Sequence, residues 1–191
     1  TFVEDAAIML PGAAILTRPG APSRSGEVEA ISAELSRREL ALESIGYPGT
    51  LDGGDICEAE DHFLIGVSAR TNEAGAEQLA RLLAGHCCTA ACIDIRRTPG
   101  ILHLKSGISY LGDNRLVVIE TLTDHPALAR YERILVPPGE EYAANCVRVN
   151  DFVLFPAGYP QLAARLRAIG CRLVELEMSE FAKMDGGLSC L

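Results

Sequence analysis

The sequence lacks a long hydrophobic run, an excess of positive charge and a regular spacing of cysteines. No stretch approaches the roughly 18 consecutive apolar residues of a membrane span, and no secretory signal peptide is recognisable. The 17 Lys and Arg residues are outnumbered by 26 Asp and Glu residues, and the net charge of −9 argues against nucleic acid or an anionic membrane as partner. An acidic pocket for a small cation remains compatible with this balance.

The seven cysteines are odd in number and their spacings suggest no disulfide framework. We therefore expect reduced, mostly buried thiols in a cytoplasmic protein. One segment, "HCCTAAC" at residues 86–92, hints at metal ligands. Adjacent cysteines seldom both bind one zinc, and this segment lies where a helix is expected to give way to a strand, so no metal site is predicted.

The residues that are present, 48% of them hydrophobic, suffice for a core and follow a repeated plan. A first clear unit predicts two short strands in "GDICEAEDHFLIGVS", a helix in "TNEAGAEQLARLLAGH" and a strand in "TAACIDI". The same order recurs in "SGISYLGDNRLVVIE", "DHPALARYE" and "RILVP", and again in "NCVRVNDFVLFP", "GYPQLAARLRAIG" and "RLVELEM". Each pair of strands is expected to turn at an aspartate, namely Asp61, Asp113 and Asp151.

The two ends of the chain fit broken units of the same kind. "TFVEDAAIML" and "AAILTRP" predict strands, residues 26–46 predict a helix, and "GGLSCL" predicts the first strand of a further unit. We expect parts of about five strand–strand–helix–strand modules in one domain over residues 1–191, the first and last being incomplete. Such modules cannot bury their apolar faces alone and must pack in a row or a ring.

A ring would bring equivalent strand starts to one axis, where three chemically capable residues would meet. Asp52 and His103 lie four and five residues before the expected first strands of their modules, and Cys190 lies within the last expected strand. An acid, an imidazole and a thiol are therefore expected to converge on one pocket.

Each of these residues also has a purely structural interpretation. A cysteine is commonly a small buried hydrophobe, although the paired glycines 186–187 before Cys190 permit close approach to a ligand or another segment. His103 fits a satisfied core histidine, yet it is the histidine placed at a module start. Asp52 fits a simple Asp-Gly turn, and Asp55 is expected to hold loop backbone amides through its carboxylate.

Two arginines and two further acids complete the set of candidates. Arg24 and Arg70 each follow an expected strand and precede a helix, so they are either exposed flanking residues or a clamp for a carboxylate. Glu4 and Asp5 are adjacent carboxylates in a hydrophobic strand opening. That place is unusual unless they line a polar pocket.

Eight segments in order resemble those of the dimethylarginine dimethylaminohydrolases, cysteine hydrolases of the guanidine-modifying (pentein) superfamily. They are "FVED", "TRPGAPSRSGE", "LDGGDI", "FLIGVSARTNEAGAEQLA", "LHLKSG", "YAANCVRVND", "PAGYPQ" and "KMDGGLSCL". The resemblance runs the full length and implies an α/β fold, a five-module ββαβ propeller. The chain would be a fragment of it that lacks most of the first module and the extreme C-terminus.

The resemblance also implies roles for individual residues. Cys190 would be the nucleophile, His103 the general acid and base, and Asp52 the carboxylate that orients His103. The residues that would bind substrate are Phe2 at the methylated end, Glu4 and Asp5 at the guanidinium, Arg24 and Arg70 at the amino-acid carboxylate, and Met184 and Asp185 along the same site.

The implied reaction hydrolyses Nω-methylated arginine to citrulline and an alkylamine through a covalent amidino-cysteine intermediate. A thiolate suits the poorly electrophilic guanidinium carbon, and the cationic substrate would itself favour the thiolate. The resemblance implies no cofactor and no metal. The expected partner is a small guanidino amino acid, with neither nucleic acid nor membrane, and a homodimer is left open.

Three alternatives remain open from the sequence. An arginine deiminase or an amidinotransferase would use the same cysteine, histidine and acid, although the connection between Gly66 and Leu83 leaves no room for a deiminase-type helical insertion there. In a different class, a non-catalytic propeller binding protein would need no acid, imidazole and thiol at the axis.

Overall fold

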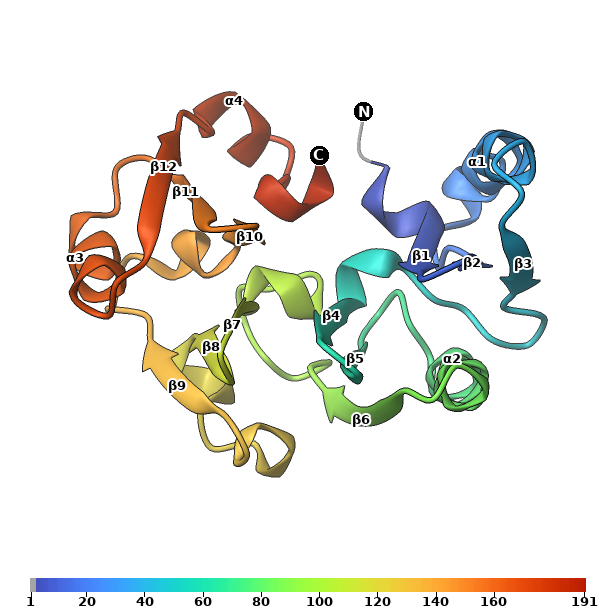
Figure 1. Ribbon diagram of the computed structural model, residues 1–191, viewed down its shortest axis with the longest axis horizontal. Coiled ribbons are helices and arrows are strands. Elements are labelled where there is room, and N and C mark those ends of the chain that lie inside the picture. Colours follow the sequence, from blue (N-terminus) through green and yellow to red (C-terminus); the bar gives the residue numbers. More distant parts are fainter. Residues whose placement is uncertain (1–2) are drawn as a thin grey trace.

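The computed structural model describes residues 3–191, which form four separate three-stranded sheets (Figure 1). In each sheet the first strand pairs antiparallel with the second, and the third strand pairs parallel with the second. The sheets are β1 (Ala7–Leu10), β2 (Ala13–Leu16) and β3 (Ala41–Ser44); β4 (Ile56–Ala59), β5 (His62–Val67) and β6 (Thr89–Asp94); β7 (Ile108–Gly112), β8 (Arg115–Val118) and β9 (Glu132–Leu135); and β10 (Val147–Val149), β11 (Phe152–Pro156) and β12 (Arg172–Leu176).

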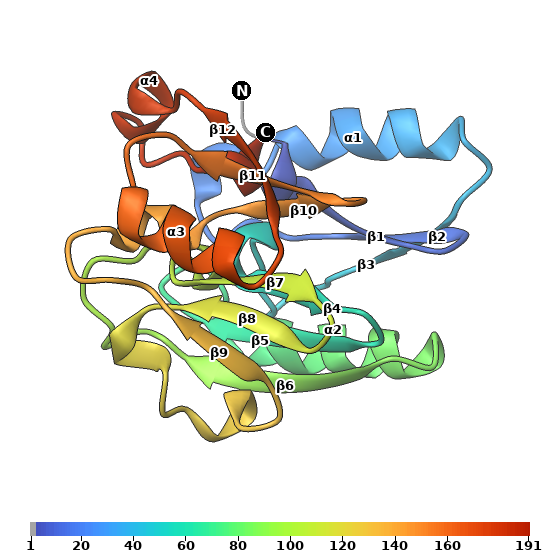
Figure 2. The same ribbon diagram turned by 60° about the vertical axis from the view of Figure 1, so that its left-hand side comes forward.

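The first strands β1, β4, β7 and β10 lie nearest the centre of the molecule, and the third strands and helices lie on its outside (Figure 1). The side view in Figure 2 shows the same sheets arranged around this centre. The predicted α/β propeller of strand–strand–helix–strand modules is therefore confirmed as the fold. Because the first strands all start at the same end, residues just before them face one central region.

Three of the modules join their second and third strands through an α-helix. These helices are α1 (Glu27–Ser36), α2 (Glu73–Gly85) and α3 (Pro160–Ala168), and a short α4 (Ser179–Ala182) follows β12. The helix expected at residues 124–132 was wrong, because that connection contains two 3₁₀ helices, Glu120–Leu122 and Pro126–Leu128. The residue before Pro126 is extended, as proline requires of its predecessor, and too few residues remain for an α-helix.

The expectations at the two ends of the chain also need correction. The helix predicted over residues 26–46 stops at Ser36, and its last part is β3, which pairs with β2 and so completes a full sheet. Pairing with a neighbour overrides the helical preference of this Leu- and Glu-rich stretch. The strand expected in "GGLSCL" is instead a 3₁₀ helix, Leu188–Cys190, which belongs to none of the four sheets.

The hairpin turns fall where the sequence placed them. Glu60, Asp113, Asn114 and Asn150 have positive φ angles, the conformation that tight turns between antiparallel strands demand. The hydrophobic core fills the space between neighbouring modules in two clusters, one around the first two sheets and one around the last three. Within the described residues, no helix combines the length and apolarity needed to cross a membrane.

Candidate active site

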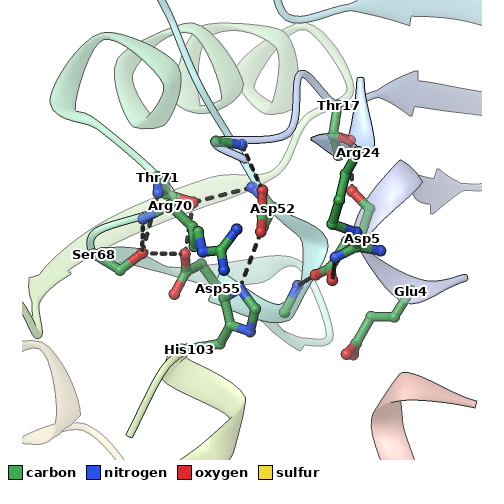
Figure 3. Close-up of polar contacts among 12 residues, drawn as sticks. Glu4, Asp5, Thr17, Arg24, Asp52, Asp55, Ser68, Arg70, Thr71 and His103 are labelled. Atoms are coloured by element: carbon green, nitrogen blue, oxygen red, sulfur yellow. Dashed lines mark hydrogen bonds and ion pairs between the residues drawn. The ribbon is translucent and has the colours of Figure 1, made fainter. Parts of the chain in front are cut away.

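His103 and Asp52 meet at the centre of the molecule, each placed just before the first strand of its module. Asp52 precedes the 3₁₀ helix Gly53–Asp55 that leads into β4, and His103 precedes the 3₁₀ helix Leu104–Ser106 that leads into β7. The His103 Nε2 atom lies 3.1 Å from Asp52 Oδ2 (Figure 3). The other carboxylate oxygen of Asp52 accepts the Gly20 N–H at 2.8 Å, which fixes the carboxylate.

These contacts bias both groups toward their charged forms. Burial alone would raise the pKa of the Asp52 carboxyl, but the hydrogen bonds from His103 and from the Gly20 N–H outweigh burial and lower it. Burial alone would lower the pKa of His103, but the hydrogen bond to Asp52 and the nearby carboxylates of Asp55 and Asp5 raise it. His103 is therefore biased toward the imidazolium, which has a proton to donate.

Asp55 serves the framework around this pair. Its Oδ1 accepts the Leu104 N–H at 3.0 Å, and its Oδ2 accepts the hydroxyls of Ser68 at 2.6 Å and Thr71 at 2.7 Å. The residue is fully buried, and that burial raises the pKa of its carboxyl. As the sequence suggested, Asp55 holds loop backbone, and it thereby fixes the residue that follows His103. Figure 3 shows its contacts with Ser68 and Thr71.

Glu4 and Asp5 lie in a 3₁₀ helix, Glu4–Ala6, directly before β1, and not in the strand expected there. Asp5 Oδ1 accepts the Gly54 N–H at 2.7 Å. Glu4 Oε1 accepts from Lys105 Nζ at 2.6 Å, and its Oε2 accepts from Ser189 Oγ at 3.1 Å. Both acids are thus held at the same end of the molecule as His103.

Two glycines make this crowding feasible. A Cβ on Gly53 would lie 2.2 Å from the Glu4 carbonyl oxygen, and a Cβ on Gly54 would lie 2.9 Å from the His103 ring. The "LDGGDI" loop therefore passes between the acidic pair and the histidine at a distance that only glycine allows.

Cys190 lies in the 3₁₀ helix Leu188–Cys190 and faces a cavity of ≈ 230 Å³ that it shares with His103 and Glu4. Its Sγ accepts the Gly187 N–H at 3.4 Å. Burial raises the pKa of the thiol to about 11; the Gly187 N–H opposes this rise, and the charges of Glu4 and Asp5 add to it. The resting sulfur is therefore a thiol at neutral pH.

The cavity can accept a cationic group with a reactive carbon. The Glu4 carboxylate, the Cys190 thiol and the His103 imidazole line this space, and the imidazole contacts the buried Asp52 carboxylate. Such a set supports nucleophilic attack by sulfur with proton transfer through the histidine.

Comparison with known proteins places the chain in a family. The family model described as arginine deiminase matches residues 42–149. The chain is 41% identical over 191 residues to the N(G),N(G)-dimethylarginine dimethylaminohydrolase of Pseudomonas aeruginosa, covering 100% of this chain and 74% of that protein. The chain belongs to the dimethylarginine dimethylaminohydrolase family.

One further relative and one solved structure agree with this membership. The enzyme of the same name from Streptomyces coelicolor is 33% identical over 190 residues, with 100% of this chain and 72% of that protein covered. A solved structure of the Pseudomonas aeruginosa protein, a cysteine-to-serine variant complexed with citrulline, superposes with a TM-score of 0.93 at 41% identity and covers 99% of this chain and 73% of that one. The sequence comparison and the structural comparison therefore agree on the family.

The dimethylarginine dimethylaminohydrolase resemblance also named residues that lie outside the cavity wall. Arg24 forms ion pairs with Asp5 and with Glu27, and Arg70 extends in the direction of Asp52 and His103 (Figure 3). Among the described residues that line the cavity, neither arginine is present.

Of the two residues predicted to bind substrate just before the Cys190 loop, one lines the cavity and the other is exposed to solvent. Asp185 lines the cavity with a φ of 56°, whereas the Met184 side chain is 56% exposed and does not line it. Phe2 lies outside the described residues.

The residues whose spacing would suit a metal ion already form hydrogen bonds and ion pairs with other groups of the protein. Within residues 3–191, one group has the spacing to hold an ion, formed by Asp5, Asp52 and His103. Their oxygen and nitrogen atoms already bind one another, backbone amides and Arg24. In the "HCCTAAC" segment, His86 Nε2 instead contacts Glu43 Oε1 at 2.5 Å.

Three residues at the site were missed from the sequence: Lys105, Asn145 and Ser189. Asn145 lies two residues before the fourth module's first strand and follows the 3₁₀ helix Glu141–Ala144, so the register that singled out Asp52 and His103 did not point to it. An uncharged amide drew no attention as a candidate for chemistry. Lys105 and Ser189 each sit next to or near a predicted catalytic residue, but only the folded ring brings them together.

Proposed function

We propose that this protein hydrolyses Nω-methylated arginine, both dimethylarginine and monomethylarginine, to citrulline and an alkylamine. The observation that carries the proposal is the shared cavity of Cys190, His103 and Glu4, in a chain 41% identical to a dimethylarginine dimethylaminohydrolase along its full length. Asp52 supports this set through its contact with His103.

The charges around Cys190 indicate that the bound substrate helps to form the thiolate. Without substrate, three acids of the site each have a cationic partner: Glu4 with Lys105, Asp5 with Arg24, and Asp52 with His103. A thiolate would then add an unbalanced negative charge, which agrees with the raised pKa of Cys190. A bound guanidinium supplies the compensating positive charge and lowers that pKa.

In the proposed reaction the Cys190 thiolate attacks the guanidinium carbon and forms a tetrahedral adduct. The His103 imidazolium donates its proton to the methylated nitrogen, the C–N bond breaks, and the alkylamine leaves. The amidino-cysteine remains. Neutral His103 then takes a proton from water, the hydroxide attacks the same carbon, and the C–S bond breaks to release citrulline. Asp52 keeps His103 oriented and stabilises its charge.

We assign substrate binding to the residues around this centre. Glu4 and Asp5 hold the guanidinium, Asp185, which lines the cavity, contacts the substrate, and Met184 contributes through its backbone. Arg24 and Arg70 bind the amino-acid carboxylate, for which Arg24 exchanges Glu27 for the substrate.

The test is citrulline release by the complete protein from dimethylarginine, monomethylarginine and arginine. The proposal expects citrulline from the methylated substrates, no turnover by Cys190→Ser, and unchanged turnover by Cys92→Ser, which alters an exposed cysteine outside the site. Turnover of arginine alone would identify a deiminase, and transfer to an added amine would identify an amidinotransferase. No product from a folded protein would leave a binding protein as the interpretation.

A further inference from the structure

Asn145 is a residue of the fourth module that reaches the site from a different position than Asp52 and His103, which each precede the 3₁₀ helix of their module. It follows the 3₁₀ helix Glu141–Ala144, precedes β10 and is 7% exposed. Its side chain lines the cavity that Cys190 faces. The fold therefore brings a buried amide to the axis, beside the charged groups described above.

The amide of Asn145 uses all of its hydrogen-bonding groups. Nδ2 donates to the Lys105 carbonyl oxygen at 3.2 Å and to Ser189 Oγ at 2.9 Å, and Oδ1 accepts the Ser189 N–H at 2.9 Å. Two of these bonds clamp one residue, the immediate neighbour of Cys190. A Cβ on Gly187 would lie 2.5 Å from Asn145 Cγ, so the loop carrying the cysteine runs directly against the amide.

Ser189 links the Asn145 amide to Glu4 by a second hydrogen bond. While its hydroxyl accepts from Asn145, its own proton goes to Glu4 Oε2 at 3.1 Å. Lys105 Nζ binds the other oxygen of Glu4 at 2.6 Å, and only 9% of the Glu4 side chain is exposed. Three segments that are far apart in the sequence are joined in this way: the start of β1, the strand entry at His103 and the cysteine loop.

We infer that Asn145 and Lys105 are positioning residues for the reaction, Asn145 by fixing the Cys190 loop through Ser189 and Lys105 by fixing the orientation and charge of Glu4. This inference rests on the proposed function. Small displacements of a nucleophile from its attack geometry are costly, on the order of a hundredfold in rate for about 1 Å. The Lys105 ammonium also partly offsets the negative charge that Glu4 places near the sulfur.

Asn145 is tested by Asn145→Asp in the complete protein, because aspartate keeps the shape and the acceptor but has no N–H to donate. The expected result is a fall in kcat of at least about tenfold with KM within about threefold, at an unchanged melting temperature. Ser189→Ala keeps the backbone N–H but breaks the link to Glu4, and it should give a smaller fall in kcat. A wild-type kcat in both variants would overturn the role of Asn145.

Lys105 is tested by the pH dependence of Cys190 alkylation by iodoacetamide, followed on the Cys190 peptide by mass spectrometry. Lys105→Met should shift the profile to higher pH, because Glu4 loses its compensating charge, and Lys105→Arg should restore it. Lys183→Met is the matched control, because Lys183 is exposed, pairs with the nearby exposed Glu180 and does not line the cavity. An unshifted profile in Lys105→Met would overturn the role of Lys105.

The two proposals fail in different ways. Wild-type protein that alkylates normally but releases no citrulline from any substrate would refute the proposed function. Wild-type turnover combined with unaffected Asn145→Asp and Lys105→Met variants would refute the positioning inference and leave the proposed function intact.

Discussion

The His103 imidazole lies 3.1 Å from a carboxylate, that of Asp52, which is completely buried. The pair spans two modules, since each residue precedes the first strand of its own sheet. A buried carboxylate in this position raises the pKa of the imidazole and fixes which ring nitrogen faces the cavity.

Replacing Asp52 by Asn should lower the pKa of His103, because the hydrogen bond to a charged acceptor and its attraction are lost. NMR titration of the His103 ring protons measures this directly. We expect a fall in kcat of about a hundredfold or more. Asp124→Asn, at an exposed position, should leave both quantities unchanged, and an unchanged His103 titration in Asp52→Asn would contradict the account.

The same pair makes stability depend on pH in a defined direction. The folded-state pKa of His103 is raised, so its contribution is fully present below the ordinary histidine pKa and is lost as pH rises through the folded-state value. The Asp52 pKa is lowered, so its contribution is present above the ordinary aspartate pKa and is lost as pH falls through the folded-state value. Urea unfolding across pH should show both losses in the wild type, whereas Asp52→Asn should lack the loss at the acid end and show a smaller loss at the histidine end.

Cys190 should react slowly with alkylating agents at neutral pH in the absence of substrate. Its thiol has a pKa of about 11, so the alkylation rate should keep rising about tenfold per pH unit beyond the ordinary thiol value of about 8.5. Adding a non-reactive guanidinium ligand should move the profile to lower pH. A plateau near neutral pH in the free protein would contradict the charge balance proposed for the site.

Gly53→Ala should lower the free energy of unfolding by about 2 kcal/mol, because its Cβ would meet the Glu4 backbone and overpack the loop. Activity should fall as well, since the acidic pair must move. Gly85→Ala is the matched control, because a Cβ there meets nothing within 4 Å. Urea unfolding distinguishes the two, and equal stability of both variants would refute the close packing described here.

Arg70→Gln should raise KM for dimethylarginine by about tenfold with a smaller change in kcat, if Arg70 binds the substrate carboxylate. Arg24→Gln should do the same and in addition release Asp5 from its ion pair. Arg165→Gln, a change at an exposed arginine of α3, serves as control. A wild-type KM in Arg70→Gln would remove this arginine from the binding site.

Much of this architecture was predictable because the modules repeat. Strand alternation and turn residues identified three hairpins, and the register of their first strands pointed to Asp52 and His103 as neighbours on the axis. The predictions from local helix preference were wrong where strand pairing or a proline determines the structure. These places are the end of α1, the strand β3 and the connection before β9.

The network of Lys105, Asn145 and Ser189 was beyond prediction for a different reason. Its members touch only once four modules are arranged in space, and nothing in the local sequence of "ANC" or "LSC" marks a hydrogen-bonded amide. The ion pair between Arg24 and Asp5 also depends on this arrangement. A carboxylate clamp was one of two interpretations of Arg24, and neither included a pairing with the guanidinium-binding acid.

The most direct test of the central claim is mass spectrometry of the complete protein, quenched in acid within the first turnovers of dimethylarginine. The account predicts an amidino adduct on the Cys190 peptide that forms before citrulline accumulates and decays when substrate is exhausted. Cys190→Ser should form neither adduct nor citrulline. Citrulline produced by the wild type without any adduct, together with turnover by Cys190→Ser, would contradict the claim that Cys190 is the nucleophile.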